Sequence, residues 1–232
     1  MLARRAGMQT RSSGDFMKRT YLVIGAAIVL VGGFLVASLL STSDPGAQRA
    51  EVAAQNPAVF NRMGSPALGP LMARAQVTEF FDPACEGCRA FHPYVKQIMQ
   101  AHEGKVRLTL RYATFHKGSD YVVKVLEAVR MQGDALYWQA LDAILEAQPV
   151  WADHGRPQPQ RVWEFIGGLG IDLERARRDM DDPRIAALIA QDTADITTLR
   201  VNKTPSFFIN GQPLREFSPD TLNAQIVEAL RS

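Results

Sequence analysis

Cysteine is scarce in this chain, and neither sign of charge predominates. The 232 residues include two cysteines and four histidines, and 26 basic residues against 24 acidic ones give a formal net charge of +2. Two cysteines cannot build the disulfide framework of a small secreted scaffold, and so small a net charge argues against a nucleic-acid partner. A hydrophobic fraction of 47% excludes a disordered or collagen-like chain.

The basic charge is concentrated at the start of the chain. Residues 1–20 hold five basic residues against one acidic residue, or +4, and the other 21 basic and 23 acidic residues leave the remainder at −2. The sequence pI of about 8.6 therefore reflects a short leader rather than a basic binding face.

One long apolar run follows this leader. Residues 21–40 contain no charged side chain, and as a helix rising about 1.5 Å per residue they would span roughly the 30 Å of a bilayer core. A cleavable signal peptide has a shorter apolar region, of about 7–15 residues. We predict an uncleaved transmembrane signal anchor in the inner membrane, with a cleaved leader as the alternative. The basic flank makes residues 1–20 a cytoplasmic tail and exports everything after residue 41, to the periplasm or the cell exterior.

Turn-forming residues dominate the next segment. Asp44-Pro45-Gly46, Asn56-Pro57, Gly64-Ser65-Pro66 and Gly69-Pro70 all fall within it. We predict a linker over residues 41–73, in which a short helix around 49–55 can form.

A strand–helix–strand pattern begins near residue 75. Residues 76–81 read as a strand that Asp82-Pro83 ends, and a helix follows from about Cys85 to His102. Residues 105–112 alternate apolar and polar side chains, which predicts a second strand with one solvent-facing side. Parallel strands joined by a helix form a right-handed crossover.

The rest of the chain completes an α/β domain over residues 74–232. Residues from about 117 to 201 show only helical patterns. Two short strands then flank the hairpin turn Asn210-Gly211, and Ser218 caps a final helix. The predicted order is β-α-β followed by β-β-α, with an all-helical insertion between the two halves.

The two cysteines lie at positions 85 and 88, where the first strand gives way to its helix. We expect Cys85 in the first helical turn, where free N–H groups and the helix dipole favour a thiolate. Cys88, one turn later, would face inward and resolve a mixed disulfide formed on Cys85.

Metal-based alternatives for this pair are weaker. A zinc site needs more ligands than two thiols, and His92 is only loosely placed as a third. Covalent haem needs histidine directly after the second cysteine, where this chain has Arg89. We expect neither a metal nor a cofactor at the pair.

Two further positions belong to the predicted site. Glu79 lies in an otherwise apolar strand, where burial would raise its pKa and let it exchange a proton with Cys88; a solvent-facing Glu79 is the alternative. Pro205 cannot donate a hydrogen bond to a sheet, so it belongs at the start of its strand. A cis bond after Thr204 would aim backbone groups of that residue at an extended substrate.

These motifs in combination resemble the DsbA-like branch of the thioredoxin superfamily. The resemblance rests on Glu79-Phe-Phe-x-x-x-Cys85-x-x-Cys88, the helical insertion and Lys203-Thr-Pro-Ser-Phe-Phe-Ile-Asn-Gly211, and covers about residues 75–232. It implies a thioredoxin fold and a periplasmic thiol:disulfide oxidoreductase. It also implies an attacking sulfur at Cys85, a resolving sulfur at Cys88, a buried acid at Glu79 and a cis-proline loop at Thr204-Pro205.

Departures from that family bear on the direction of electron flow. Glu86-Gly87 stands where strongly oxidising members have Pro-His, and a glutamate opposes a neighbouring thiolate. We therefore expect a potential several tens of mV below the most oxidising members, where ~30 mV corresponds to about 1.4 kcal/mol. His116 and Lys117 are interpreted as boundary residues of the insertion, with a place beside the sulfurs as the alternative.

The sequence leaves three functions open. The first is disulfide exchange with exported cysteine-containing proteins, with a quinone-linked membrane oxidase regenerating the pair. The second is a reductase or isomerase of the same fold, kept reduced by a membrane electron donor. The third is a copper or zinc chaperone that uses the thiols as ligands.

Overall fold

A computed structural model describes residues 45–60 and 62–231 of the chain. The predicted cytoplasmic tail and the predicted span over 21–40 lie outside these residues. Within the described ranges, every helix is too short or too polar to cross a bilayer.

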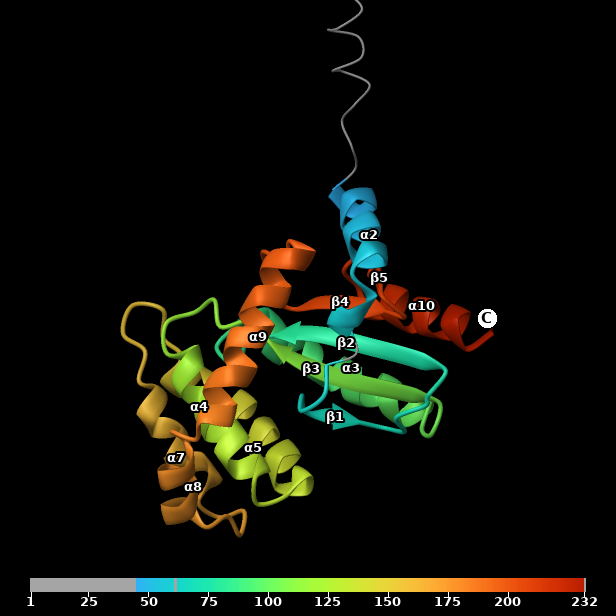
Figure 1. The fold of residues 1–232 in the computed structure, drawn as a ribbon. Helices are drawn as coiled ribbons and strands as arrows, with labels where there is room; N and C mark the ends of the chain where they lie inside the picture. Colours follow the sequence, from blue (N-terminus) through green and yellow to red (C-terminus); the bar gives the residue numbers. More distant parts are fainter. Residues whose placement is uncertain (1–44, 61, 232) are drawn as a thin grey trace, which may run out of the picture. The chain divides into compact units, whose positions relative to one another are not determined.

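A five-stranded sheet forms the centre of the described domain (Figure 1), in the order β1-β3-β2-β4-β5. Its strands are β1 (Ala67–Leu68), β2 (Ala75–Phe81), β3 (Val106–Tyr112), β4 (Ser206–Ile209) and β5 (Gln212–Pro213). The central pair β2 and β3 is parallel, in a register that places Ala75 opposite Val106. The pairs β1–β3, β2–β4 and β4–β5 are antiparallel. The predicted parallel crossover and the predicted hairpin are confirmed.

Helices occupy the segments that the sequence predicted to be helical. The crossover helix is α3 (Glu86–Ala101), and the last helix is α10 (Pro219–Arg231), whose first turn Ser218 caps by accepting from the Thr221 N–H at 3.1 Å. The insertion contains α4 (Ser119–Arg130), α5 (Asp134–Glu146), α6 (Gln148–Trp151), η2 (Pro159–Arg161), α7 (Val162–Ile166), α8 (Leu173–Asp179) and α9 (Pro183–Leu199). Figure 1 shows α4, α5, α7 and α8 grouped beyond one end of the sheet.

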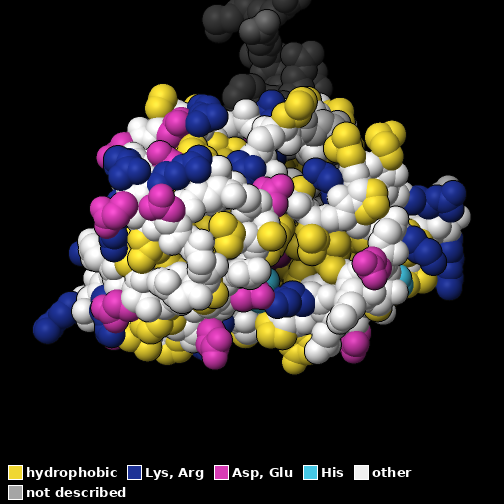
Figure 2. Space-filling model, turned by 90° about the horizontal axis from the view of Figure 1, so that it is seen from below, with side chains coloured by type: hydrophobic (Ala, Val, Ile, Leu, Met, Phe, Trp, Pro, Cys, Tyr) yellow, Lys and Arg dark blue, Asp and Glu magenta, His cyan; other side chains and the backbone are white. Residues whose placement is uncertain are grey.

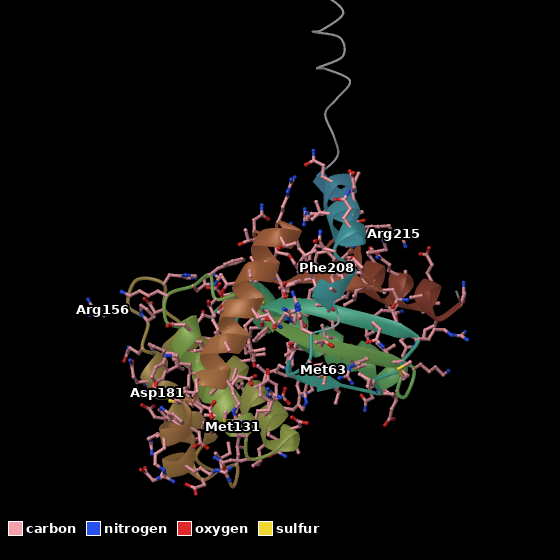
Figure 3. The ribbon with its side chains drawn as sticks, viewed as in Figure 1. Met63, Met131, Arg156, Asp181, Phe208 and Arg215 are labelled. Atoms are coloured by element: carbon pink, nitrogen blue, oxygen red, sulfur yellow. The ribbon has the colours of Figure 1, made fainter. Side chains whose placement is uncertain are left out.

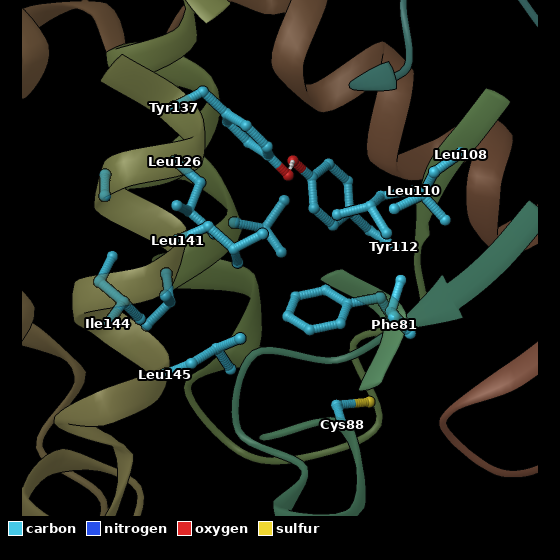
Figure 4. Packing of buried hydrophobic residues seen from close by; sticks show 14 of the residues in the cluster. Phe81, Cys88, Leu108, Leu110, Tyr112, Leu126, Tyr137, Leu141, Ile144 and Leu145 are labelled. Atoms are coloured by element: carbon cyan, nitrogen blue, oxygen red, sulfur yellow. Dashed lines mark hydrogen bonds between the residues drawn. The ribbon is translucent and has the colours of Figure 1, made fainter. Parts of the chain in front are cut away.

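The main core joins the sheet to the insertion. Apolar side chains on one face of β2 and β3, among them Phe81, Leu108 and Leu110, pack in one cluster with residues of α4 and α5. Figure 4 shows this packing, with Cys88 at its margin. The redox pair therefore lies where the thioredoxin-like half meets the helical insertion.

Residues 45–73 differ from the predicted linker, because they pack on the domain. The segment contains α2 (Pro45–Gln55), η1 (Pro57–Phe60) and the edge strand β1. Ala53 and Val59 are buried in a second core cluster with Phe208 of β4, and the Phe60 and Phe208 ring centroids are 5.2 Å apart. Figure 3 shows Phe208 on the side of the sheet nearest α2. The turn-forming residues shape the path of this segment, while its apolar residues cover an otherwise exposed sheet face.

Strand β3 also differs from its prediction near its end. Arg107 and Thr109 are partly exposed as expected, but Arg111 is only 1% exposed. Its guanidinium donates to Asp192 at 2.6 Å and to Asp195 at 2.5 Å, both on α9. A third bond, 2.7 Å long, runs to the carbonyl oxygen of Val59. Burial of the charge is possible because α9 supplies its counter-charges.

The surface carries charges of both signs. Seen from below the view of Figure 1, acidic and basic side chains are interspersed, and hydrophobic side chains gather around a hollow in the middle of that face (Figure 2). Large hydrophobic residues that remain exposed include Tyr94, Phe115 and Phe217.

The buried ion cluster yields a stability prediction. We expect Arg111→Leu to lower the free energy of unfolding by about 3–5 kcal/mol, because it leaves the buried Asp192 carboxylate without its cation, while Asp195 keeps its pair with Arg62. Arg107→Leu, on the same strand but partly exposed, is the matched control and should change stability by about 1 kcal/mol or less. Urea unfolding measures both; similar losses in the two variants would contradict the buried-cluster interpretation.

Candidate active site

The Cys85–Cys88 pair begins helix α3 directly after β2. Cys85 is the N-cap residue, with φ −79° and ψ 121°, so it precedes the first helical turn in which the sequence placed it. The expected proximity to free helix N–H groups is retained, because the N-cap lies beside the unpaired donors of the first turn. Cys88 follows one turn later, on the buried face of α3.

The two thiols are both buried, but their pKa values shift in opposite directions. Cys88 is 0% exposed and Cys85 is 7% exposed. A hydrogen bond from the Cys88 thiol is the main cause that lowers the pKa of Cys85 to about 5; burial opposes this, while Thr204 and the N–H groups of Cys88 and Gly87 contribute to the lowering. Burial, followed by the bond to Cys85, raises the pKa of Cys88 well above its ordinary value. Of the two, Cys85 is therefore the thiolate at neutral pH.

The cis-proline loop lies directly opposite the pair. The Thr204–Pro205 peptide bond is cis, as the resemblance implied. Sγ of Cys85 lies 3.3 Å from the carbonyl oxygen of Thr204, which accepts a hydrogen bond from the sulfur only while the thiol is protonated. Gly87 leaves room for this approach: a Cβ there would lie 3.3 Å from Pro205 Cδ and 3.5 Å from Cys85 Sγ. The small residue in the dipeptide thus lets the loop reach the sulfur.

Glu79 is buried, as predicted. It is 3% exposed, and in the sheet it is paired with Leu110 of β3 and Phe207 of β4. Burial, and secondarily the negative charge of Cys85, raises its pKa to about 8. Its charge in turn raises the pKa of Cys88, so the carboxyl group is close enough to the inner thiol to interact electrostatically.

Asp82 is a part of the site that sequence reasoning missed. It was interpreted only as a strand terminator, yet it is fully buried. Its backbone N–H points at Cys88 Sγ, 3.4 Å away. Its carboxylate accepts hydrogen bonds from backbone N–H groups, an imidazole and a hydroxyl, which belong to Ala84, Phe115, His116 and Ser119. It therefore ties the cysteine loop to the start of the insertion.

Gln148 of α6 is a second residue without a sequence signal. Its buried side-chain amide donates to the carbonyl oxygens of Pro83, at 2.8 Å, and Cys85, at 3.0 Å. Its own carbonyl accepts from Arg89 of α3 at 3.0 Å. The insertion thus holds the cysteine loop through a residue that belongs to no predicted motif. These residues come together only in the folded structure.

The charge of Glu86 is partly compensated. Its carboxylate lies 2.5 Å from Nε2 of His154, in the segment between α6 and η2. A hydrogen bond from its own backbone N–H, together with His154, lowers the pKa of Glu86. The sequence-based expectation of an unopposed glutamate beside the thiolate did not include this partner.

Histidines near the pair do not complete a metal site within the described ranges. His92, considered as a zinc ligand, is bound through Nε2 to Asp142 at 2.7 Å. No group of three or more His, Cys, Asp or Glu residues in the described part of the chain is placed to hold a metal ion.

The fold and the cysteine pair define a thioredoxin-fold protein with a CxxC site. The thioredoxin family model matches residues 61–228, more than half of the chain. The chain therefore belongs to the thioredoxin family.

Individual relatives refine this assignment. The probable disulfide bond formation protein D of Bacillus anthracis is 24% identical over 196 residues, covering 82% of this chain and 86% of that protein. The structure of the thiol-disulfide exchange protein alpha-DsbA2 from Wolbachia pipientis has a TM-score of 0.68 at 18% identity, covering 81% of this chain and 99% of that one. The fold is DsbA-like.

A different set of relatives is much longer than this chain. The Na(+)/H(+) antiporter NhaA 1 of Salinispora arenicola is 27% identical over 163 residues, which is 69% of this chain and 24% of that protein. The chain spans about a quarter of the length of the antiporters it matches.

The opposite pKa shifts of the two thiols yield a titration prediction. In the reduced chain, we expect ultraviolet thiolate absorbance to rise with a midpoint near pH 5, because Cys88 donates to the Cys85 thiolate. Cys88→Ala removes that donor and should move the midpoint upward, whereas Cys85→Ala should abolish the transition near pH 5. An unshifted midpoint in Cys88→Ala would contradict the assigned cause.

The burial of Glu79 yields a second pH-dependent prediction. Because its folded-state pKa is raised from 4.5 to about 8, the folded chain binds this proton more tightly than the unfolded chain, and stability falls as pH rises between those values. Glu79→Gln removes this loss, so above pH 8 the reduced variant should be more stable than the parent by up to roughly 4–5 kcal/mol.

Urea unfolding of the reduced chain at pH 5 and pH 9 checks the Glu79 prediction. Glu103→Gln, on an exposed turn, is the control and should follow the parent at both values. Parallel pH dependence in the parent and Glu79→Gln would rule out a buried neutral Glu79.

Proposed function

We propose that the chain is an extracytoplasmic thiol:disulfide oxidoreductase that exchanges disulfides with exported cysteine-containing proteins. The single observation that carries this proposal is the asymmetry of the pair: Cys85 has a pKa of about 5, and the pKa of the fully buried Cys88 is well above 9. A low-pKa sulfur at a helix start beside a buried partner is suited to form and then resolve mixed disulfides.

The reaction in the oxidising direction starts from the Cys85–Cys88 disulfide. A client thiolate attacks Sγ of Cys85, a client–Cys85 disulfide forms and the Cys85–Cys88 bond breaks, leaving the electron pair on Cys88. Glu79 supplies the proton that Cys88 takes up. The client's second thiolate then attacks its own sulfur in the mixed disulfide and releases Cys85 as a thiolate. The client loses two electrons and the pair gains them.

The cis-proline loop provides the contact for the client backbone. Thr204 and Pro205 border Cys85, and the Thr204 carbonyl oxygen lies 3.3 Å from its sulfur. An extended client segment that pairs with the backbone of Thr204 would place its cysteine beside Cys85, as in strand-addition recognition.

The low pKa of Cys85 favours oxidation over reduction. Stabilising the thiolate stabilises the reduced state of the pair, which raises the reduction potential. The His154 partner of Glu86 offsets part of the expected opposing charge. We therefore favour disulfide donation over the reductase and isomerase functions of the same fold.

The cellular setting follows from the apolar run over residues 21–40. Acting as a signal anchor, it would hold the chain in the inner membrane with the catalytic domain outside the cytoplasm. A quinone-linked membrane oxidase is the proposed electron acceptor that regenerates the disulfide. For the reductase function, a membrane electron donor would take its place.

Trapping and the reduction potential together test the function. We expect Cys88→Ala to accumulate mixed disulfides with an oxidised client, located by mass spectrometry at Cys85, because the Cys85 thiolate attacks the client's disulfide and the resolving thiol is absent. Cys85→Ala is the control and should trap none. The parent should equilibrate with glutathione at a potential well above the roughly −270 mV of thioredoxin.

Two outcomes would overturn this proposal in different ways. A potential near that of thioredoxin would assign the reductase function instead. Failure of Cys88→Ala to trap any client, combined with tight stoichiometric copper or zinc binding by the parent, would assign the metal chaperone.

A further inference from the structure

Two histidines outside the CxxC motif bind acidic residues that precede and follow Cys85 in the chain. His116, at the start of the insertion, binds Asp82 through Nδ1 at 2.7 Å, three residues before Cys85. His154 binds Glu86, the residue directly after Cys85. The two imidazole rings contact each other, with centroids 5.4 Å apart. An Asp82–His116–His154–Glu86 chain therefore passes beside the nucleophile, and we call it the histidine bridge.

The histidine bridge is buried at Asp82 and exposed at Glu86. Asp82 is buried, and it binds both the ring and the backbone N–H of His116, at 2.7 and 3.0 Å. His154 and Glu86 are largely exposed. The two hydrogen bonds to Asp82 thus fix the His116 ring beside the cysteine loop, whereas His154 and Glu86 are exposed to solvent.

The charges that surround His116 favour its protonated form. The groups that act on it are Asp82, Cys85 and Glu86, all acidic, with the ring of His154 as its aromatic neighbour. Burial lowers its pKa, but the bond to Asp82 and the three negative charges outweigh this and raise it. By reciprocity, a cation that Cys85 stabilises must itself stabilise the Cys85 thiolate.

We propose that His116 is a positioning residue that stabilises the Cys85 thiolate from outside the CxxC motif, and that His154 acts separately by neutralising Glu86. Strongly oxidising relatives place a histidine in the dipeptide itself; here the insertion supplies one from residue 116. This inference rests on the proposed function, because it concerns the same sulfur.

The proposal makes the oxidising power of the pair depend on pH. Protonated His116 favours the reduced state, which contains the thiolate, over the neutral disulfide. Raising the pH deprotonates His116 and removes this preference, so the potential should fall more steeply with pH than thiol titration alone requires.

The test compares His116→Gln with His116→Ala. Glutamine keeps a neutral hydrogen-bond donor for Asp82, so it should retain the fold while losing the charge. We expect His116→Gln to shift the glutathione equilibrium constant about threefold toward the disulfide form at pH 6 and to raise the pKa of Cys85 by about 0.5. The shift should diminish as the pH rises and the parent histidine loses its proton.

Matched variants separate the two histidines. His154→Gln should shift the equilibrium in the parent but have no effect in a Glu86→Gln background, whereas His116→Gln should act in both. His102→Gln, at the far end of α3 and bound to Asn223, is the control and should have no effect.

The outcomes are distinguishable from failure of the proposed function. If Cys88→Ala traps clients but His116→Gln keeps the parental equilibrium at pH 6 and pH 9, while His116→Ala only loses stability, His116 is purely structural and the inference is wrong. If Cys88→Ala traps no client, the proposed function fails instead, whatever the histidine variants do.

Discussion

The hydrogen bond from the Cys88 thiol to the Cys85 sulfur is the interaction on which the redox chemistry depends. It is the largest contribution to the low pKa of Cys85, and it requires Cys88 to remain a protonated donor. Full burial of Cys88 meets that requirement, because a second thiolate in the apolar core would be costly. The same burial leaves Cys85, at the helix start, as the sulfur that meets the client.

This asymmetry is maintained by contacts from three separate parts of the chain. Thr204 of the cis-proline loop contributes to the low pKa of Cys85, Asp82 holds the loop before the pair, and Gln148 binds the backbone from the insertion. The helical insertion is therefore part of the site as well as part of the core. Its packing against β2 and β3 holds Gln148 and the other contacting residues beside the two cysteines.

Local patterns in the sequence were enough to predict much of this molecule. Alternation and periodicity predicted β2, α3 and β3, and Asn210-Gly211 indicated the hairpin. The cis bond before Pro205 was implied by the family resemblance. What the sequence could not show depends on distant partners. Nothing near Arg111 indicates burial, because its counter-charges lie 81 and 84 residues away on α9. The short helix around 49–55 was anticipated, but its packing on the sheet and the role of Gln148 were missed for the same reason: both depend on partners distant in the sequence.

Comparing the stability of the two redox states tests the central claim most directly. If the reduced pair is stabilised by its thiolate, the dithiol form must unfold at higher denaturant than the disulfide form at pH 7, with the difference shrinking as pH falls through about 5. An ordinary structural disulfide behaves in the opposite way, stabilising the oxidised chain by about 2–4 kcal/mol. A more stable oxidised form at pH 7 would contradict the account.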